Sequence, residues 1–379
     1  MIAVVGGGLI GLSVAWYLRQ RGFDVVVYEK NSAGRGASWA SAGMLAPNLE
    51  AEPGEENLVK LLLESLKMWP AFAQSLEKQS GIDVGYRTEG TLSVALNRDD
   101  VQRLRFQHRF MKELGLDVEF IDGETVLEQE PFINRNVQAA LHSRSDHQVD
   151  ARQAVEAVKK VFMDSGGVLK ERCGVAKVVV EDGMVVGVFS CEGFRSFENV
   201  VLAAGPWSRH VDGLPEQERP PVRPVKGQMI AVRDTGTTPL VQHVVWGPQR
   251  PWGPCYIVPK RGGRILLGTT VEEKGFDVSV TAGGLMNILR GCWEVLPALS
   301  ELPVEEVWAG LRPGSPDDAP IIGPSSTKGL FIATGHFRNG ILLAPFTAKA
   351  AADYMETGKL DDLAKPFSPQ RFKPRDEPG

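Results

Sequence analysis

Two arginines stand in sequence surroundings that indicate ligand binding. Arg312 lies within the string WAGLRPG and Arg338 within GHFRNGILLAP, both rich in glycine and apolar residues. A guanidinium buried in such surroundings needs an anionic partner, and its planar fork matches a carboxylate. The alternative is a structural ion pair inside the protein, with Asp317 and Asp318 as nearby candidates. We favour the ligand interpretation for both arginines.

The N-terminal residues supply a second kind of site. An apolar strand at 2–5 runs directly into the loop GGGLIG, a helical pattern follows over 12–21, and a strand at 25–28 ends at Glu29. Strand, glycine loop, helix, strand and acidic residue occur in the order of a dinucleotide-binding unit. An ordinary strand–helix turn is the alternative, but it does not explain the complete series. The sequence therefore predicts a bound dinucleotide.

Each part of this unit has its own physical role. Gly6 permits the tight turn, Gly8 lets a pyrophosphate approach the backbone, and Gly11 lets the helix pack closely on the sheet. The helix N-terminus faces the phosphate charge. Glu29 is placed to accept hydrogen bonds from a ribose hydroxyl and disfavours a 2′-phosphate. These residues do not distinguish NAD from FAD. The small-residue loop at 34–44 is expected to lie close to a flat ligand.

The remaining elements indicate a cofactor domain that is interrupted by a second domain. Helices are predicted at 58–79, 101–115, 151–165 (capped by Asp150), 284–296 and 340–356, and strands at 86–100, 168–169, 175–180, 185–189, 199–204 and 330–335. We predict an α/β protein with a Rossmann-like cofactor domain and an antiparallel-sheet substrate domain. The cofactor domain takes segments 1–85, 150–220 and 315–379, and the substrate domain takes 86–149 and 221–314.

Composition excludes several classes of function. The chain has 379 residues, 43% hydrophobic and 23% charged, with a net charge of −5. Scattered Lys and Arg leave no footprint for nucleic acid. We expect no signal peptide, because the apolar start belongs to the glycine unit, and no membrane span. The four cysteines form no Cys-x-x-Cys pair. We therefore expect no metal site and buried free thiols in the reducing cytoplasm.

Four motifs carry a resemblance to the FAD-dependent amine and amino-acid oxidases, the family that includes D-amino-acid oxidase and sarcosine oxidase. They are the N-terminal unit, the loop at 38–44, VLAAGPWS at 201–208 and GHFRNGILLAP at 335–345. The resemblance covers almost the whole chain. Within the family, CYIVP at 255–259 and WAGLRPG at 308–314 resemble the glycine oxidases of the thiamine-biosynthetic type. The distant motif at 335–345 favours FAD over NAD.

The resemblance implies which residues hold FAD. The expected cofactor-binding residues are Gly6, Gly8, Leu9, Ile10, Gly11, Glu29, Lys30, Ala37, Ser38, Ala42, Gly43, Met44, Val175, Gly205, His336, Phe337, Arg338, Asn339, Gly340, Ile341 and Leu342. A helix beginning near Gly340 would direct its positive end at the flavin ring and stabilise the negative charge that reduction adds there. No Cys follows Arg312 closely, so we expect the FAD to be bound non-covalently.

The resemblance also implies a substrate site. Arg312 is expected to bind the carboxylate of a small amino acid, with Arg338 assisting. Tyr256 is a second expected donor, with ordinary core packing as its alternative. Val271 stands where a larger Met would narrow the pocket, so sarcosine or D-alanine could compete with glycine. The loop at 244–254 is longer than expected and could be a lid.

The expected reaction is oxidative deamination. A hydride leaves Cα for flavin N5, the imine is hydrolysed to a keto acid (glyoxylate, from glycine) and ammonia, and O2 is reduced to H2O2. No side chain is expected to act as an obligatory acid or base. A homotetramer is expected by resemblance. Four rival interpretations remain: an FAD-dependent D-amino-acid dehydrogenase with another acceptor, a sarcosine- or proline-type oxidase, an NAD-dependent dehydrogenase, and a non-enzymatic dinucleotide-binding module.

Overall fold

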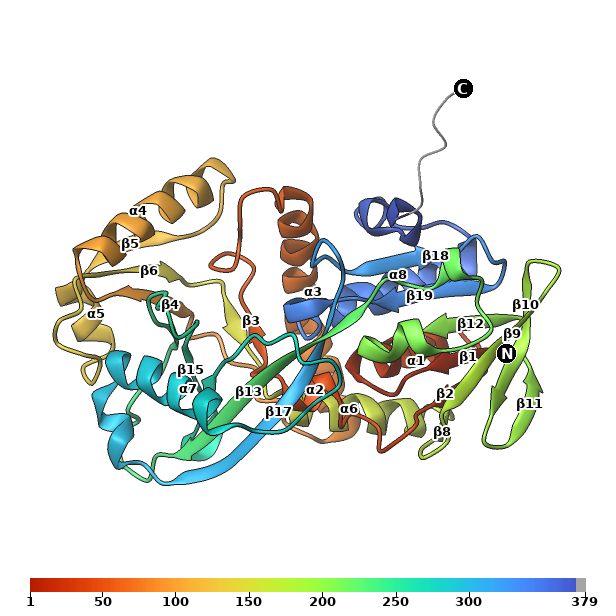
Figure 1. Ribbon diagram of the computed structural model, residues 1–379, viewed down its shortest axis with the longest axis horizontal. Helices are drawn as coiled ribbons and strands as arrows, with labels where there is room; N and C mark the ends of the chain where they lie inside the picture. Colours follow the sequence, from red (N-terminus) through yellow and green to blue (C-terminus); the bar gives the residue numbers. More distant parts are fainter. Residues whose placement is uncertain (373–379) are drawn as a thin grey trace.

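The computed structural model describes residues 1–372 and contains two large sheets, seen at the two ends of the molecule in Figure 1. The first sheet has six strands, which are, in spatial order, β18 (Ile321–Pro324), β19 (Leu330–Thr334), β12 (Asn199–Leu202), β1 (Ile2–Val5), β2 (Val25–Tyr28) and β8 (Val168–Lys170). Every neighbouring pair is parallel except β18–β19. The four residues of β1 and of β2 are all buried, as continuous apolar strands predict.

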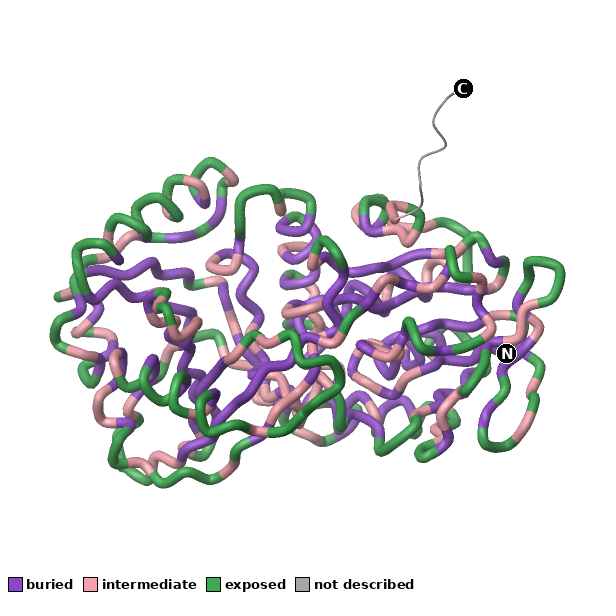
Figure 2. The backbone as a smooth tube through the Cα atoms, in the orientation of Figure 1, coloured by how far each residue is buried: buried purple, intermediate pink, exposed green. Residues whose placement is uncertain are grey.

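Four helices share an apolar core with this sheet: α1 (Leu9–Gln20), α3 (Glu56–Ser80), α6 (Ala151–Asp164) and α8 (Ala344–Thr357). Asp150 caps α6 as expected, since its side chain accepts from the N–H groups of Arg152 and Gln153 at 2.9 and 3.2 Å. Helix α3 is tied to the segment before α8, because Ser65 and Trp69 both donate to the Leu342 carbonyl. Figure 2 shows the strands at the centre of each sheet as buried.

The second sheet has eight strands, in the order β17 (Val304–Gly314), β13 (Arg223–Arg233), β16 (Arg264–Gly268), β15 (Tyr256–Pro259), β14 (Val244–Trp246), β4 (Thr91–Ala95), β6 (Ala139–Ser143) and β5 (Glu119–Asp122). All pairs are antiparallel except β14–β4. Its helices are α4 (Arg98–Glu113), α5 (Gly123–Gln129) and α7 (Ala282–Val295). The paired strands β13 and β17, with 11 residues each, reach from this sheet toward the first one (Figure 1).

A third sheet corrects the prediction about the cysteines. Strands β9 (Val175–Glu181), β10 (Met184–Ser190) and β11 (Gly193–Ser196) form an antiparallel meander. Ser190 lies opposite Val175, so the hairpin brings Cys173 and Cys191 together, with 5.3 Å between their Cα atoms, and they form a disulfide. The expectation of four free thiols is therefore wrong for this pair. Cys255 and Cys292 are free and buried.

The sheets draw on separate parts of the chain. The six-stranded sheet takes its strands from segments 1–85, 150–220 and 315–379, and the eight-stranded sheet takes its strands from 86–149 and 221–314. Residues 373–379 of the last predicted segment lie outside the described residues. The α/β architecture is confirmed, while the domain boundaries themselves stay a prediction.

Two predicted elements differ from the structure. The strand expected at 86–100 is only β4, because Asn97 accepts from the Asp100 N–H at 3.0 Å and starts α4. The last helix starts at Ala344 and not near Gly340, and a short 3-10 turn (Phe337–Asn339) precedes it. The smaller elements α2 (Ala37–Ala40), β3 (Met44–Leu45) and β7 (His147–Gln148) were not predicted, since two to four residues carry no periodic signal.

The tightest glycine contact in the N-terminal unit gives a test of the fold. A Cβ at Gly11 would lie 2.0 Å from the Gly6 carbonyl oxygen. We expect Gly11→Ala to lower the thermal midpoint by several degrees, since overpacking costs about 1–3 kcal/mol, and to reduce the bound FAD. Gly283→Ala is the matched control, because Gly283 in α7 meets nothing within 4 Å. An equal thermal midpoint and FAD content for the two variants would contradict this packing role.

Candidate functional site

One cavity of about 1150 Å³ extends along the boundary between the two large sheets. Nearly all of the predicted site residues line it: Gly6, Gly8, Leu9, Ile10, Glu29, Lys30, Ala37, Ser38, Ala42, Met44, Val175, Gly205, Tyr256, Val271, Arg312, His336, Phe337, Arg338, Asn339, Gly340, Ile341 and Leu342. Gly11 and Gly43 do not line it. Gly11 packs α1 against the loop, and a Cβ at Gly43 would meet the Val149 carbonyl oxygen at 2.1 Å. Residues far apart in sequence therefore meet in one elongated space.

The glycine loop is shaped for a ligand at the start of α1. Gly6 has a φ of +111°, a conformation that favours glycine. A Cβ at Gly8 would meet only Ser38 Oγ, at 3.5 Å, so the space before it is open. No acidic residue lies in the first turn of α1, which leaves the positive end of the helix available for an anion. Glu29 stays nearby by accepting from the N–H groups of Gly7 and Asn31, each at 2.9 Å.

An aromatic stack borders the part of the cavity next to Glu29. Lys30 Nζ lies 3.4 Å from the ring centroid of Trp207, and Phe276 stacks on Trp207 with centroids 5.6 Å apart. Burial lowers the pKa of Lys30, and the Glu29 carboxylate opposes that shift. Phe276 belongs to the loop after β16, so this contact ties the eight-stranded sheet to the first sheet's side of the cavity.

The other end of the cavity is bordered by the segment before α8. His336 donates to or accepts from the Thr347 hydroxyl at 3.0 Å, and burial lowers the pKa of His336 to about 3, so the imidazole is neutral. Asn339, Leu343 and Ala344 direct their N–H groups at carbonyls of this segment. Within the described chain, no such backbone bond is made by the N–H groups of residues 340–342. The N–H groups of residues 340–342 are therefore available as hydrogen-bond donors to a ligand. This is the role that was expected of a helix start near Gly340.

Several buried polar atoms on the cavity wall lack a partner among the described residues. They are Tyr28 OH, Trp246 Nε1 and Asn339 Nδ2. A buried donor without an acceptor costs roughly 1–3 kcal/mol, so a bound group that pairs with these atoms is favoured. Their positions span both sheets, which fits a long ligand with polar groups at intervals.

Arg312 is the cation whose charge is left for a ligand. Its guanidinium donates to the Thr270 carbonyl at 3.1 Å, the Thr269 hydroxyl at 2.8 Å and the Lys226 carbonyl at 3.4 Å. No carboxylate within residues 1–372 forms an ion pair with it. A Cβ at Gly227, which lies beneath the guanidinium, would meet Arg312 Nη1 at 2.4 Å. The protein therefore fixes the guanidinium through neutral oxygens and leaves its charge uncompensated.

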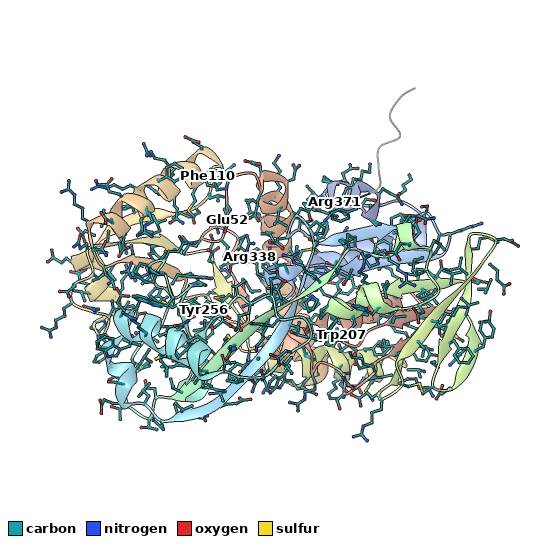
Figure 3. All side chains as sticks on the ribbon, in the orientation of Figure 1. Glu52, Phe110, Trp207, Tyr256, Arg338 and Arg371 are labelled. Carbon is teal, nitrogen blue, oxygen red and sulfur yellow. A yellow bond between two sulfur atoms is a disulfide. The ribbon has the colours of Figure 1, made fainter. Side chains whose placement is uncertain are left out.

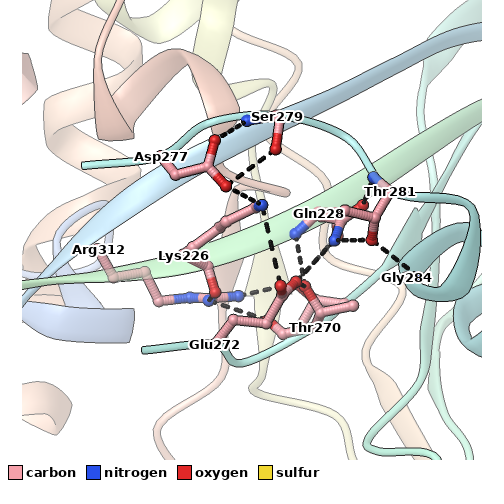
Figure 4. A network of polar contacts seen from close by, with 10 residues as sticks. Lys226, Gln228, Thr270, Glu272, Asp277, Ser279, Thr281, Gly284 and Arg312 are labelled. Atoms are coloured by element: carbon pink, nitrogen blue, oxygen red, sulfur yellow. Dashed lines mark hydrogen bonds and ion pairs between the residues drawn. The ribbon is translucent and has the colours of Figure 1, made fainter. Parts of the chain in front are cut away.

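Figure 4 shows the network that holds these neutral oxygens in place. Lys226 is 1% exposed and pairs with Asp277 at 3.3 Å and with Glu272 at 3.8 Å. Glu272 also accepts from Gln228 at 2.7 Å and from the Thr270 hydroxyl at 2.5 Å. Lys226 on β13 therefore anchors the loop that carries the oxygens facing Arg312.

Tyr256 lies on β15 beside Arg312. Its hydroxyl is 3.2 Å from the Met229 sulfur. Burial raises the pKa of Tyr256, while Arg312 and Thr269 lower it and Glu50 raises it. The phenol is therefore protonated and lies in the field of both Arg312 and Glu50. Its position on the cavity wall agrees with the expected donor role, which stays a prediction.

Arg338 is placed differently from the expectation. Its guanidinium pairs with Glu50 at 3.2 Å and with Glu55 at 2.8 Å. The alternative partners named from sequence are wrong, because Asp317 pairs with Arg371 at 2.8 Å and Asp318 lies 3.7 Å from Arg223. Figure 3 shows Arg338 in the middle of the molecule, with Tyr256 on the side of the eight-stranded sheet. The charge of Arg338 is already compensated, which weakens its expected role in binding a substrate carboxylate.

Of the segment expected to be a loop at 244–254, residues 244–246 form β14, and the remainder covers one side of the cavity and is held by an ion cluster around Arg250. Arg250 pairs with Asp100 on α4 at 2.8 Å and with Glu294 on α7 at 2.6 Å. Trp246, Gly247, Pro248, Gln249 and Pro254 line the cavity. Val271 also lines the cavity, although 57% of its surface is exposed.

Fold and cavity together define a class of protein. A parallel sheet whose glycine loop and helix start open into a long cavity, next to a second sheet that presents an unpaired arginine, is the arrangement of a dinucleotide-dependent enzyme for small anionic substrates. The family model "FAD dependent oxidoreductase" matches residues 1–354. The chain belongs to this family, and the prediction made from its motifs is confirmed.

Individual relatives agree with this assignment. The chain is similar to a glycine oxidase of Geobacillus kaustophilus, with 34% identity over 97% of this chain and 96% of the relative. The crystal structure of glycine oxidase from Geobacillus kaustophilus superposes with a TM-score of 0.91 at 33% identity and covers 98% of this chain and 99% of that chain. A bifunctional protein ThiO/ThiG of a Synechocystis species is 33% identical over 98% of this chain. The chain spans about half of that relative's length, 54%.

The cavity fits the FAD that the family requires. The glycine loop and α1 suit a pyrophosphate, Glu29 suits a ribose, and the free N–H groups at 340–342 with Asn339 suit the flavin carbonyls. Sequence reasoning missed Glu50, Glu55 and the support from Lys226. Glu50 and Glu55 stand in the acidic string EAEPGEE, which is typical of a solvated surface, and nothing in that string indicates a buried partner. Among residues 1–372, no group of three or more His, Cys, Asp or Glu could hold a metal ion.

The uncompensated charge of Arg312 gives a direct test of the anion site. We expect Arg312→Ala to raise the Kd for acetate, and the KM for a small amino acid, by 30-fold or more, since a lost buried charge pair costs about 2–5 kcal/mol. Arg233→Ala is the matched control, because Arg233 lies at the far end of β13 and pairs with Glu305. Acetate titrations followed by the flavin spectrum measure both variants. An unchanged Kd in Arg312→Ala would remove Arg312 from the anion site.

Proposed function

We propose that this protein is an FAD-dependent oxidase of glycine and of other small amines or D-amino acids, such as sarcosine and D-alanine. The observation that carries the proposal is a single cavity that joins a dinucleotide-binding loop to an arginine without an acidic partner. An amino-acid carboxylate would form an ion pair with Arg312 and neutralise its charge. The glycine oxidases among the similar proteins support the substrate class.

The chain's residues would bind and orient the substrate. The Arg312 fork and the Tyr256 hydroxyl hold the carboxylate, which restricts the rotation of the substrate and directs Cα toward the segment 336–342. Pro248, Trp246 and the rest of the loop at 244–254 exclude water from that side. Bound FAD supplies the two-electron acceptor that takes the hydride from Cα and passes the electrons to O2. For glycine the products would be glyoxylate, ammonia and H2O2.

The setting of the enzyme is a further part of the proposal. The resemblance to glycine oxidases of the thiamine-biosynthetic type supports a role of the reaction in thiamine biosynthesis. A homotetramer is expected, and helix α7 presents Met286, Leu289 and Trp293 as an exposed apolar face that another subunit could cover. No helix among residues 1–372 is both long and apolar enough to cross a membrane. A cytoplasmic location stays a prediction, because a disulfide such as Cys173–Cys191 is uncommon in reducing compartments.

A substrate panel tests the proposed reaction. Under anaerobic conditions we expect glycine, sarcosine and D-alanine to bleach the flavin of the holoenzyme, and in air we expect one H2O2 to form for each glyoxylate from glycine. Flavin bleaching without peroxide in air would identify a dehydrogenase that uses another acceptor. An absence of bleaching with the whole panel, D-proline included, would contradict an amino-acid oxidase or dehydrogenase.

The attachment of FAD can be tested independently. The cavity is lined by no cysteine, since Cys255 and Cys292 are buried elsewhere and Cys173 is bonded to Cys191. We therefore expect acid precipitation to release the yellow flavin into the supernatant, with the protein pellet colourless. Flavin that stays with the pellet would show a covalent bond.

A further inference from the structure

The cavity wall carries two opposite excesses of charge. Arg312 has no carboxylate partner within the described chain, whereas the guanidinium of Arg338 is shared by two carboxylates, Glu50 and Glu55. Three of the four contacts that these groups make with one another involve a single nitrogen, Arg338 Nη2, which donates to both Glu55 carboxylate oxygens and to the Glu50 carbonyl. One cation cannot neutralise two anions, so a surplus of negative charge remains at Arg338 and a surplus of positive charge at Arg312.

Glu50 is the carboxylate of this pair that faces the ligand space. It lines the cavity, and Glu55 does not. Its position is fixed by the turn before it, because Asp146 accepts from the N–H groups of Asn48 and Leu49 at 3.1 and 2.9 Å. The Glu50 side chain is 14% exposed. A carboxylate held this firmly on a cavity wall is a preformed site for a cation.

Tyr256 links the two charged regions. The charges of Arg312 and Glu50 both act on the pKa of its hydroxyl, which Arg312 lowers and Glu50 raises. Arg312, Tyr256 and Glu50 all line the one cavity, where they present a positive group, a neutral donor and a negative group. A zwitterionic amino acid has the complementary arrangement, a carboxylate and an ammonium group separated by one carbon.

We propose that Glu50 binds the ammonium group of the substrate and accepts one proton from it, and that Arg338 is a positioning residue that holds the Glu50 carboxylate. The inference rests on the proposed function. In the step an N–H bond of the ammonium breaks and an O–H bond forms on Glu50, which leaves a neutral amine beside a neutral carboxylic acid. The neutral amine has the nitrogen lone pair that hydride loss from Cα requires. This replaces two expectations from sequence, a direct substrate contact by Arg338 and the lack of any acid–base residue.

The electrostatic surroundings of Glu50 suit this role. Burial raises the pKa of Glu50 to about 7, with Arg338 opposing the shift and Asp146 and Glu55 adding to it. Tyr256, which is protonated, is the further titratable group that faces it. A proton acceptor works best when its pKa lies near the working pH.

The pH dependence of anaerobic flavin reduction by glycine tests the proposal. In the wild-type holoenzyme we expect the apparent second-order rate constant to rise with pH and to level off above about 7, as Glu50 becomes ionised. We call this rise near pH 7 the limb of the pH profile. In Glu50→Gln the limb disappears, and the rate constant follows the free amine fraction of the substrate. The rate at pH 7 falls by about 10²-fold, the usual contribution of a proton-transfer group. A Glu50→Gln variant that keeps the limb near pH 7 overturns the proposal.

Neighbouring acids provide matched controls. Glu55→Gln removes a negative charge near Glu50 and leaves Glu50 as the remaining carboxylate partner of Arg338. Both effects lower the pKa of Glu50, so we expect the limb to move to lower pH. Arg338→Met removes the opposing cation, so the limb moves to higher pH. Glu56→Gln, at an exposed position of the same segment that does not line the cavity, leaves the limb in place. A purely structural role would not move the limb in opposite directions, and shifts in one common direction would overturn the assignment.

Acetate binding separates the proposal from a general loss of structure. Acetate carries a carboxylate and no amine, so Glu50→Gln and Arg338→Met should keep or gain affinity for it, whereas Arg312→Ala loses affinity. Weaker acetate binding in Arg338→Met would restore Arg338 as a carboxylate ligand and overturn its positioning role. If the wild type does not react with the amino-acid panel, the proposed function fails. If it reacts and Glu50→Gln behaves as the wild type, only the present inference fails.

Discussion

The pairing of β13 with β17 is the constraint on which the site depends. The register places Val225 opposite Arg312 and Gly227 opposite Gly310. This register puts Gly227 beneath the guanidinium and Gly310 against Ala40 of α2. A Cβ on Gly310 would lie 2.3 Å from the Ala40 Cβ. A shift by one residue would turn Arg312 to the other face of the sheet. The pairing of β13 with β17 therefore fixes the position of Arg312 relative to α2, which lies on the cofactor side of the cavity.

Charge is distributed along the cavity in a way that favours one kind of ligand. The positive end of α1 faces the part expected to hold a pyrophosphate, and Glu29 faces the part expected to hold a ribose. Arg312, which has no carboxylate partner among the described residues, and Glu50, which shares one guanidinium with Glu55, both line the same cavity, as does Tyr256. The uncompensated charges cost folding free energy when the cavity is empty, and a ligand of matching charge returns it. On the proposed assignment, a simple carboxylic acid or a simple amine would pair with only one of the two charges.

Local signals explain what could be predicted from sequence. Gly6, Gly8, Gly11 and Glu29 act within one strand–helix–strand unit, so their roles follow from spacing alone. The cavity brings Arg312 and the segment 336–342 to that unit, as the family resemblance implied. The ion pair of Arg338 could not be predicted, because Glu55 is separated from it by 283 positions. The string around Glu50 also looks like solvated surface.

The disulfide is a different case, because a usable signal was present. Asp182-Gly183, a typical turn dipeptide, stands between the predicted strands at 175–180 and 185–189, and pairing outward from it leads to the opposed residues Val175 and Ser190, close to Cys173 and Cys191. The irregularities at Val185/Gly187 and Phe189/Ser190 shift the register and hide the exact partners. For the redox state of these two cysteines, the expected reducing compartment was a poorer predictor than the geometry of the hairpin. The helix start near Gly340 was misplaced for a similar reason, since a turn and a helix begin with the same residue types.

The order of strands in the six-stranded sheet has a consequence for how the protein is made. β1 lies between β2 and β12, and β19 lies next to β12, so the sheet combines residues from both ends of the described chain. During synthesis the glycine loop is finished first, yet the strand beside it and the turn at 340–342 emerge only much later. Such distant pairings slow folding. A nascent chain must therefore carry β1 with only β2 beside it until β12 has been made, and the turn at 340–342 completes the cavity only near the end of synthesis.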